Sequence, residues 1–299
     1  MLAIQAREAG GPEVLETVEV PKPEPKPGQV LIRQEAVGLN FIDTYQRSGL
    51  YPVKFPAVLG TEGAGVVEAI GEGVSRFKVG DRAAYAGGGG GYAEYAVVPE
   101  GRAVHVPAGV STQIAAGALL KGMTAEFLLR RCYPVQAGQT VLIHATAGGV
   151  GTIMVQWAKL IGARVIGTAG SQEKAALAKS FGCDEVILYR DEDVAARVRE
   201  MTGGTGVPVA YDSVGKDTFE GTLGSLARRG MFVSFGNASG PVPPFSPLRL
   251  TQAGSLFFTR PTMFDYTATT EELDDSAGAL FALISQGKIK VEIGQTFAL

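Results

Sequence analysis

The sequence predicts an α/β protein in which an all-β, barrel-like unit is followed by a doubly wound parallel sheet. Before residue 111, short strand patterns are separated by many glycine and proline turns, which is typical of an all-β unit. From residue 141 onward, short apolar runs alternate with segments of helical period, which is typical of a parallel sheet covered by helices. The length of 299 residues and the hydrophobic content of 45% leave room for two ordinary domains with sizeable cores.

We expect the all-β part to begin with a β-hairpin over residues 1–20 that turns at Gly10–Pro12. The proline-rich segment 21–28 predicts a stiff extended connector. The further elements expected here are a strand over 30–36, a strand end entering a short helix over 37–45, a glycine-rich strand pair over 59–71, and strand segments over 80–83 and 92–98.

The period becomes helical from Ser111, and we expect two helices, over 114–120 and 124–131, with a break at Lys121-Gly122. Asp191 is the expected N-cap of a later helix. The elements expected after residue 140 are strands over 141–144, 164–168, 186–189, 207–211, 231–235 and 255–259, helices over 152–161, 171–181, 191–201, 218–227 and 271–286, and a last strand over 290–293.

The small-residue turn at 145–151, between the first of these strands and its helix, predicts a dinucleotide site. Glycine is needed there because backbone N–H groups must approach a pyrophosphate closely, and because the helix must lie close to the strand. The helix N-terminus adds about half a positive charge beneath the phosphates. Thr146 stands where the motif has its first glycine, whereas Gly148 and Gly151 fill the other two places.

The tip of the second strand indicates which dinucleotide is bound. A site for NAD usually places Asp or Glu there to bind the ribose hydroxyls. This chain has Ala169, Gly170 and Ser171 instead, followed by Lys174, so no carboxylate would repel a 2′-phosphate. This pattern favours NADPH. The alternative, in which Ser171 is an N-cap and Lys174 lies on a solvated helix face, is compatible with the same role.

Composition excludes several classes of protein. The net charge of −3 gives no general attraction to nucleic acid or to an anionic membrane. Cys132 and Cys183 lie far apart without a partner pattern, which argues for a reducing compartment and against a disulfide or zinc framework. The first residues are too polar for a signal peptide, and no apolar stretch approaches 18 residues. We therefore expect a cytoplasmic protein without a membrane span.

Several stretches carry a resemblance to a known family: VGLNFIDTYQRSGLYP (37–52), LGTEGAGVV (59–67), ALLKGMTAEFLLR (118–130), HATAGGVG (144–151), YDSVGKDTF (211–219), RRGMFVSFGNASG (228–240) and SLFFTRP (255–261). Together they resemble the zinc-free quinone oxidoreductases (the zeta-crystallin type) of the medium-chain dehydrogenase/reductase superfamily. The resemblance implies a GroES-like β-barrel catalytic domain over 1–123, an NADPH-binding Rossmann domain over 124–265, and a return to the catalytic domain over 266–299. It also implies a homodimer.

The resemblance further implies a helix and a strand beyond the last strand expected here, so we expect the C-terminal end of the catalytic domain to be incomplete in this chain. Zinc-dependent relatives have a cysteine in place of Asn40 and a His-Glu pair in place of Thr61-Glu62. Asn and Thr are poor zinc ligands, so we expect a zinc-independent protein without a metal site. The structural zinc lobe is also missing near Gly87–Gly91. His144 is interpreted as a sheet-end residue, with a catalytic role as the alternative.

The function implied by the resemblance is hydride transfer from NADPH to a quinone. A quinone accepts hydride readily, so the protein must mainly orient the two reactants. Asn40, Tyr45 and Tyr51 are the candidates to line the acceptor cleft, although Tyr51 alternatively packs beside Pro52. No essential acid–base residue is expected, because solvent can protonate the product. A 2-alkenal or enone double-bond reductase and a non-enzymatic NADPH- or RNA-binding protein remain the alternatives, and the charge argues against RNA.

The resemblance also implies the cofactor contacts. Gly148, Gly149 and Val150 are expected at the pyrophosphate. Ser171, Lys174 and Tyr189 are expected around the 2′-phosphate. The other expected contacts are Lys121, Thr124, Ser213, Phe235, Gly236, Asn237, Phe258 and Arg260. Lys121 is alternatively a surface lysine at a helix break, and Arg228-Arg229 is interpreted as a solvated helix C-terminus.

Overall fold

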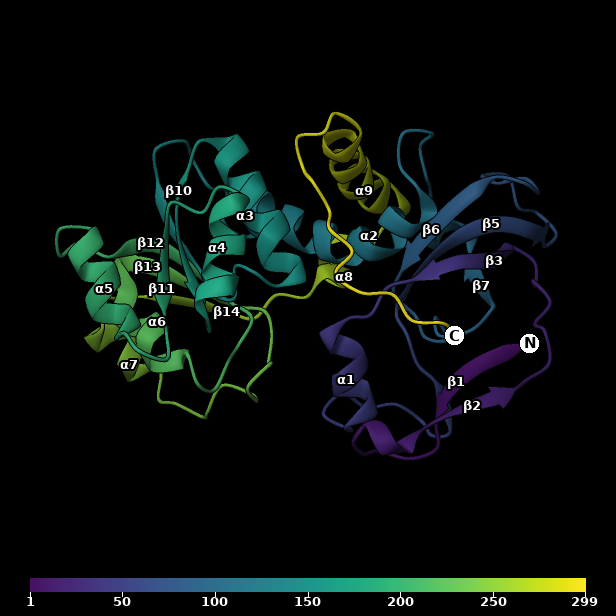
Figure 1. The fold of residues 1–299 in the computed structure, drawn as a ribbon, viewed down its shortest axis with the longest axis horizontal. Coiled ribbons are helices and arrows are strands. Elements are labelled where there is room, and N and C mark those ends of the chain that lie inside the picture. Colours follow the sequence, from purple (N-terminus) through teal and green to yellow (C-terminus); the bar gives the residue numbers. More distant parts are fainter. The chain divides into compact units, whose positions relative to one another are not determined.

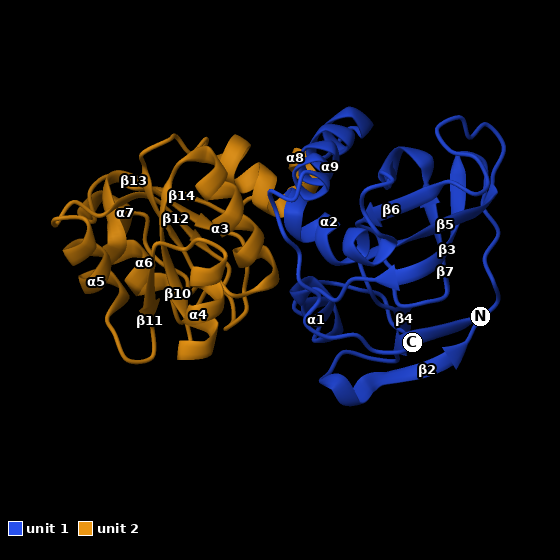
Figure 2. Cartoon of the chain, turned by 45° about the horizontal axis from the view of Figure 1, so that its top comes forward, with its two compact units in different colours: residues 1–123, 267–299 blue, residues 124–266 orange.

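The computed structural model describes residues 1–299 and divides the chain into two compact units (Figures 1 and 2). Unit 1 comprises Met1–Met123 and Thr267–Leu299, and unit 2 comprises Thr124–Tyr266. The chain therefore leaves unit 1, builds unit 2 without interruption, and returns to unit 1 for its last segment.

Unit 1 contains two antiparallel sheets, with strand orders β2-β1-β4 and β7-β3-β5-β6-β8. The larger sheet encloses a core that includes Val30, Ile32 and Val67, and Val30 and Ile32 share one face of β3, as the period of a strand requires. The expected hairpin is confirmed by the pairing of β1 with β2. The elements of unit 1 are β1 (Leu2–Ala6), β2 (Leu15–Glu19), β3 (Gln29–Val37), α1 (Phe41–Arg47), β4 (Ala57–Val58), β5 (Glu62–Ile70), β6 (Arg82–Ala86), β7 (Tyr95–Pro99), β8 (Ala103–His105), α2 (Thr112–Phe127, which continues into unit 2) and α9 (Thr270–Ser285), with 3-10 turns at Pro12–Val14 and Glu100–Arg102.

Unit 2 is built on one six-stranded sheet in which all strands are parallel, in the order β11-β10-β9-β12-β13-β14. This confirms the doubly wound sheet. The order reverses between β9 and β12, so the topological switch point lies there. The elements are a π-helix (Leu128–Cys132), β9 (Thr140–Ile143), α3 (Gly149–Ile161), β10 (Arg164–Ala169), α4 (Gln172–Ser180), β11 (Glu185–Leu188), α5 (Val194–Met201), β12 (Val207–Asp212), α6 (Phe219–Ser225), β13 (Leu226–Ser234), α7 (Leu248–Gln252), β14 (Phe257–Thr259) and α8 (Met263–Tyr266).

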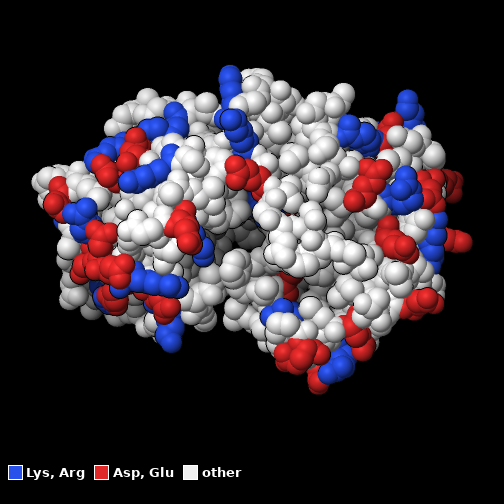
Figure 3. All heavy atoms as spheres, viewed as in Figure 1, with Lys and Arg blue, Asp and Glu red and all other residues white.

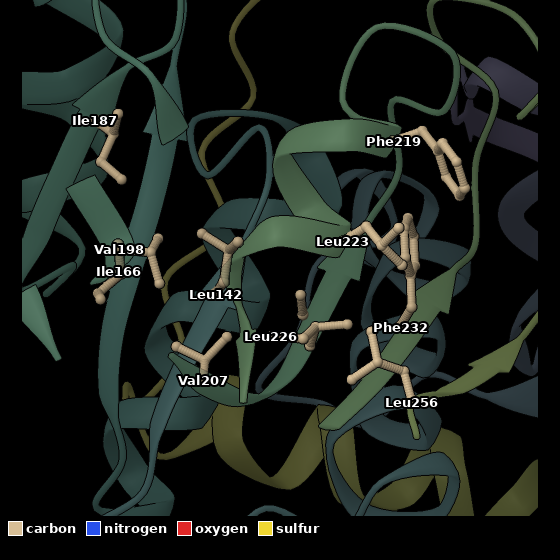
Figure 4. Close-up of a cluster of buried hydrophobic side chains, with 11 residues drawn as sticks. Leu142, Ile166, Ile187, Val198, Val207, Phe219, Leu223, Leu226, Phe232 and Leu256 are labelled. Atoms are coloured by element: carbon tan, nitrogen blue, oxygen red, sulfur yellow. The ribbon is translucent and has the colours of Figure 1, made fainter. Parts of the chain in front are cut away.

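The core of unit 2 lies where the sheet meets the helices that cover one of its faces (Figure 4). Each strand contributes its buried apolar residues, and α5 and α6 contribute theirs from the helical side. The labelled members of this cluster are Leu142, Ile166, Ile187, Val198, Val207, Phe219, Leu223, Leu226, Phe232 and Leu256. This packing fixes the strands in register, and their carboxyl ends therefore form a defined edge.

The expected break at Lys121-Gly122 is wrong, because α2 runs through both residues. Gly122 is needed for packing and not for a turn: a Cβ on it would lie 2.3 Å from Cδ2 of Leu280 in α9. The alanines and leucines around it are good helix formers and carry the helix across this position.

Four other expectations about elements are also wrong. The range 59–71 contains one strand, β5, and not a strand pair, because Gly63 and Gly65 lie within a ladder that β3 and β6 flank. The N-cap of α5 is Asp193, whose side chain accepts from the Ala196 amide, and not Asp191. Arg228 and Arg229 lie within β13 and not at a helix C-terminus, and residues 290–293 form no strand.

No helix of the chain is long and apolar enough to cross a lipid bilayer. Acidic and basic side chains are interspersed over the face seen in Figure 3, without a large region of one sign. This surface agrees with the small net charge of −3.

Candidate functional site

The carboxyl edge of the unit 2 sheet is where ligands bind in folds of this topology. Because the strands are parallel, the residues that follow each strand meet at this edge. The structure thus brings together a large part of the expected cofactor residues, namely Gly148, Gly149 and Val150 after β9, Ser171 and Lys174 after β10, Tyr189 after β11, Ser213 after β12, Phe235, Gly236 and Asn237 after β13, and Arg260 after β14.

The glycine turn after β9 has the geometry of a phosphate cradle. Gly148 is the N-cap of α3, and both Gly148 and Gly149 are exposed. A Cβ on Gly151 would lie 2.3 Å from the carbonyl oxygen of Ala145, so only glycine allows the helix to start this close to the turn. The first-turn N–H groups of α3 have no acceptor within the helix and can bind an anion.

Thr146 takes the place of the first glycine by anchoring the turn to β10. Its amide and its hydroxyl both donate to the carbonyl oxygen of Thr168, each at 3.1 Å. Gly167 leaves room for this contact, because a Cβ there would lie 2.7 Å from the Thr146 side chain. Gly167 on β10 thus provides the space that the Thr146 side chain needs at the position where the motif has its first glycine.

At the tip of β10, the Tyr189 side chain lies directly against Gly170. A Cβ on Gly170 would lie 2.7 Å from the hydroxyl oxygen of Tyr189, so the phenol group reaches from the end of β11 to the end of β10. Ser171 caps α4 by accepting from the Lys174 amide, at 3.3 Å. The Lys174 side chain is exposed, and no carboxylate stands at residues 169–171. The residues expected at a 2′-phosphate therefore meet at one corner.

The loops after β12 and β13 are packed closely upon one another. A Cβ on Gly236 would lie 2.2 Å from the carbonyl oxygen of Ser213, which also accepts from the Ala238 amide. Arg260 donates to the carbonyl oxygen of Ser234, at 3.1 Å. Phe258 lies in an aromatic group, with its ring 5.0 Å from that of Phe232.

Thr124 is the first residue of unit 2 and lies on α2, not in one of the loops after the strands. It is buried, and its hydroxyl lies 3.8 Å from the sulfur of Met263. The role of Thr124 as a cofactor contact therefore stays a prediction.

In unit 1, the three residues expected at the acceptor lie on or beside α1. Asn40 is the N-cap of α1 and is 6% exposed. Tyr45 and Tyr51 stand edge to face, with ring centroids 5.3 Å apart. Tyr51 therefore packs on Tyr45, and its role at the acceptor stays a prediction. The two phenols and the amide are thus held by one short helix and the turn that follows it.

Sequence reasoning missed Glu62, which binds both Asn40 and Lys121. Its carboxylate accepts from the Asn40 amide nitrogen at 2.8 Å, from the Lys121 ammonium at 3.2 Å and from the Leu120 backbone amide at 2.7 Å. Glu62 is fully buried, and the Lys121 side chain is 17% exposed. Lys121 is therefore neither at a helix break nor a surface lysine. The signal available was a carboxylate at the start of a strand, in an otherwise apolar, glycine-rich run.

A second carboxylate, Asp43, extends this polar cluster. It accepts from the Asn40 backbone amide at 2.8 Å, from the Thr61 hydroxyl at 2.9 Å and from the Tyr92 hydroxyl at 2.7 Å. Burial raises the pKa of Asp43 and that of Glu62, because each charged form is removed from water. Burial also raises the pKa of Tyr92, beside the Asp43 charge.

Two protein families match this chain in the same order as its parts. Residues 26–108 match the alcohol dehydrogenase GroES-like domain, and residues 149–280 match the zinc-binding dehydrogenase family. The combination confirms a Rossmann sheet with a GroES-like domain as the fold class.

The chain is 53% identical to a quinone oxidoreductase of Pseudomonas aeruginosa, over 99% of this chain and 92% of that protein. The solved structure of Escherichia coli quinone oxidoreductase complexed with NADPH matches it with a TM-score of 0.97 and 46% identity, over 98% of this chain and 91% of that one. The chain belongs to the quinone oxidoreductase family. A 2-haloacrylate reductase of Burkholderia is also similar, with 41% identity over 100% of this chain and 92% of that protein.

Membership in the quinone oxidoreductase family confirms the resemblance carried by the sequence motifs. The residues at the carboxyl edge fit the dinucleotide NADPH, because the cradle needs glycine at Gly151 and the strand tip carries no carboxylate. At the two positions where zinc-dependent relatives have ligands, the Asn40 side chain donates to Glu62 and the Thr61 hydroxyl donates to Asp43. No group of three or more His, Cys, Asp or Glu residues suited to a metal ion is found in the chain.

Proposed function

We propose that this protein is an oxidoreductase that transfers hydride from NADPH to quinones without zinc. Residues 124–265 act as the NADPH-binding domain, and residues 1–123 and 266–299 act as the catalytic domain. The observation that carries the proposal is the corner at the tip of β10, where Ser171, Lys174 and Tyr189 meet without a carboxylate. The quinone oxidoreductases that are 46–53% identical over nearly the whole chain support the choice of acceptor.

Unit 2 binds the cofactor through groups of opposite charge and through close backbone approach. The first-turn amides of α3, at Gly149 and Val150, hold the pyrophosphate above the helix N-terminus. Lys174 supplies a positive charge to the 2′-phosphate, and the hydroxyls of Ser171 and Tyr189 donate hydrogen bonds to it. The other proposed contacts are Lys121, Thr124, Gly148, Ser213, Phe235, Gly236, Asn237, Phe258 and Arg260.

Unit 1 supplies the residues that orient the acceptor. When bound, NADPH supplies the hydride from its nicotinamide ring. Tyr45 and Tyr51 offer aromatic surface to a flat acceptor, and their hydroxyls can donate to an oxygen on which negative charge develops. Asn40 is held in place by Glu62 and acts beside them. Solvent protonates the product, so none of these residues needs to transfer a proton.

The proposal extends to a homodimer in the cytoplasm. The dimer rests on the family resemblance. The reducing compartment rests on the cysteines: both are free thiols, and burial raises the pKa of Cys183 to about 12, which keeps that thiol protonated.

The test is NADPH oxidation, followed by its absorbance, with 1,4-benzoquinone, with a 2-alkenal and without acceptor. NADH is run in parallel, and a chelator is added to one set. We expect quinone-dependent, chelator-resistant turnover that prefers NADPH.

Each other outcome changes one part of the proposal. Turnover with the alkenal alone would replace the substrate class and keep the cofactor. Loss of activity with the chelator would contradict zinc independence. NADPH binding without turnover would favour a binding role, and RNA binding that NADPH displaces would identify it.

A further inference from the structure

A line of buried polar side chains runs beneath the carboxyl edge of unit 2, across the switch point between β9 and β12. It joins Thr168 on β10, His144 after β9, Thr222 on α6 and Asp212 at the end of β12. Each of these four residues is at most 1% exposed. Polar groups this deeply buried must satisfy one another, so the positions of their protons can be worked out.

Asp212 is the fixed end of the line, since its carboxylate only accepts. One oxygen accepts from the amides of Val214 and Gly215, at 2.8 and 3.0 Å. The other oxygen accepts from the hydroxyls of Thr218 and Thr222, at 2.7 and 2.9 Å. Asp212 thereby folds the loop that follows β12 back onto its own strand.

The Thr222 hydroxyl has one proton and three neighbours. Its oxygen lies 2.9 Å from Asp212, 2.7 Å from the carbonyl oxygen of Thr218 and 2.9 Å from Nε2 of His144. The Asp212 carboxylate and the Thr218 carbonyl oxygen cannot donate. The Thr222 hydroxyl must therefore donate its proton to one of these two oxygens, because donating it to Nε2 would leave the hydroxyl oxygen facing both of them with no hydrogen bond to either. The imidazole Nε2 must therefore carry a proton and donate it to Thr222.

The other ring nitrogen of His144 is then an acceptor. Nδ1 lies 3.1 Å from the hydroxyl oxygen of Thr168, which donates its proton to the ring. The same oxygen accepts from the Ala145 backbone amide, at 3.2 Å. Every polar atom of the line is satisfied by this arrangement, with His144 neutral and protonated at Nε2.

The two ends of the line hold the two loops on either side of the switch point. At one end, Thr168 holds Ala145, whose φ of 54° lies in the left-handed region and starts the glycine turn. At the other end, Asp212 holds Val214 and Gly215, next to Ser213. In this topology the dinucleotide lies in the crevice between such loops.

We propose that His144, as its neutral Nε2–H tautomer, is a positioning residue that sets the loops after β9 and β12 at the spacing the dinucleotide needs. The inference rests on the proposed NADPH site and adds to it a buried residue that touches neither the cofactor nor the acceptor. It also assigns the direction of the hydrogen bonds: Thr168 donates to His144, and His144 donates to Thr222, whose own proton goes to Asp212 or to the Thr218 carbonyl oxygen.

The first test observes the tautomer directly by long-range ¹H–¹⁵N correlation of the imidazole rings. The chain has two histidines, so the spectrum is simple. His105 is exposed and stacks on Phe77, and serves as the internal reference. At pH 7 we expect one ring in the Nε2–H form, assigned to His144 because it is missing from His144→Gln. An Nδ1–H tautomer or a charged ring would overturn the proposal.

The second test measures NADPH affinity in Thr222→Val, which keeps the shape and removes the hydroxyl, and in Thr222→Ser, which restores it. We expect the Kd for NADPH to rise roughly tenfold in Thr222→Val, with kcat for quinone within about twofold of the wild type. Thr222→Ser should recover the affinity. The Nε2–H signal should weaken in Thr222→Val, because its acceptor is lost.

The outcomes separate this inference from the proposed function. If the wild type binds NADPH and Thr222→Val binds it equally well, the positioning role is wrong and the proposed function stands. If kcat falls while the affinity is unchanged, the line acts in some other way and the proposal is also wrong. If the wild type itself does not bind NADPH, the proposed function fails, and the positioning role fails with it, whatever the tautomer is.

Discussion

Lys174 is the exposed side chain that we propose selects the cofactor. Its backbone amide donates to Ser171 in the first turn of α4, and its side chain is exposed. The backbone hydrogen bond fixes the position of the Lys174 Cα, and the flexible side chain can extend from there toward a 2′-phosphate. Charge at this position matters for a 2′-phosphate and not for a 2′-hydroxyl.

We expect Lys174→Ala to raise the Kd for NADPH roughly tenfold and to change that for NADH by less than about twofold. Titration of each cofactor by fluorescence measures the two constants. Lys179→Ala is the matched control, because it removes the same charge from the exposed face at the other end of α4. An equal loss for both cofactors in Lys174→Ala would place the 2′-phosphate elsewhere.

Glu62 illustrates which residues a sequence conceals. Its partners Asn40 and Lys121 lie 22 and 59 positions away, so no local pattern joins them. The residues of the glycine turn could be predicted because strand, turn and helix are adjacent in the chain. The polar cluster around Glu62 could not, because only the tertiary fold brings its members together.

At the scale of elements, the close packing of α2 on α9 depends on the absence of one side chain. Gly122 lies under Leu280, and a methyl group there would have no room. Gly278 in α9 offers a contrast within the same pair of helices, because a Cβ on it would meet nothing within 4 Å.

Gly122→Ala should lower the free energy of unfolding by about 1–3 kcal/mol, because the added methyl group overpacks the contact with Leu280. Gly278→Ala should raise it by about 0.5–1 kcal/mol, because alanine gains helix propensity without a clash. Urea unfolding of both variants checks this pair. A stabilised Gly122→Ala would show that α9 can move away freely.

The order and type of the unit 2 strands and of helices α3 to α6 followed from the alternation of apolar runs with helical periods, whereas the short helices α7 and α8 were not predicted. The errors lie where tertiary contacts override local signals. The Lys121-Gly122 sequence is typical of a helix break, but the contact with Leu280 explains the glycine. Asp191 and Asp193 are equally good N-caps by type, and only the geometry of the loop selects Asp193. The segment 290–293 has the residues of a strand but pairs with none.

At the scale of the whole molecule, buried ionisable groups make stability depend on pH. Burial raises the pKa of Glu62 above its ordinary value of 4.5. The folded protein then holds this proton at pH values where the unfolded chain has already released it. The contribution of Glu62 to the free energy of unfolding is therefore greatest below pH 4.5 and is lost as the pH rises above it.

Glu62→Gln should remove this dependence, since glutamine does not titrate. We expect the unfolding free energy of the wild type, relative to Glu62→Gln, to fall by up to about 1.4 kcal/mol per pH unit just above pH 4.5. Chemical denaturation at several pH values measures the difference. Glu16→Gln makes the same charge change on an exposed strand and should leave the wild-type dependence in place. A difference that grows with pH would mean that Lys121 outweighs the cost of burial.

The tyrosine that covers Gly170 has a consequence for how cofactor choice can change over time. A carboxylate introduced at position 170 to suit NADH would collide with the Tyr189 hydroxyl, whose oxygen lies 2.7 Å from where the new Cβ would be. Replacing Tyr189 first would remove the proposed donor to the 2′-phosphate before any new preference exists. With Tyr189 in that proposed role, the two positions are epistatic, because each substitution made alone would weaken cofactor binding.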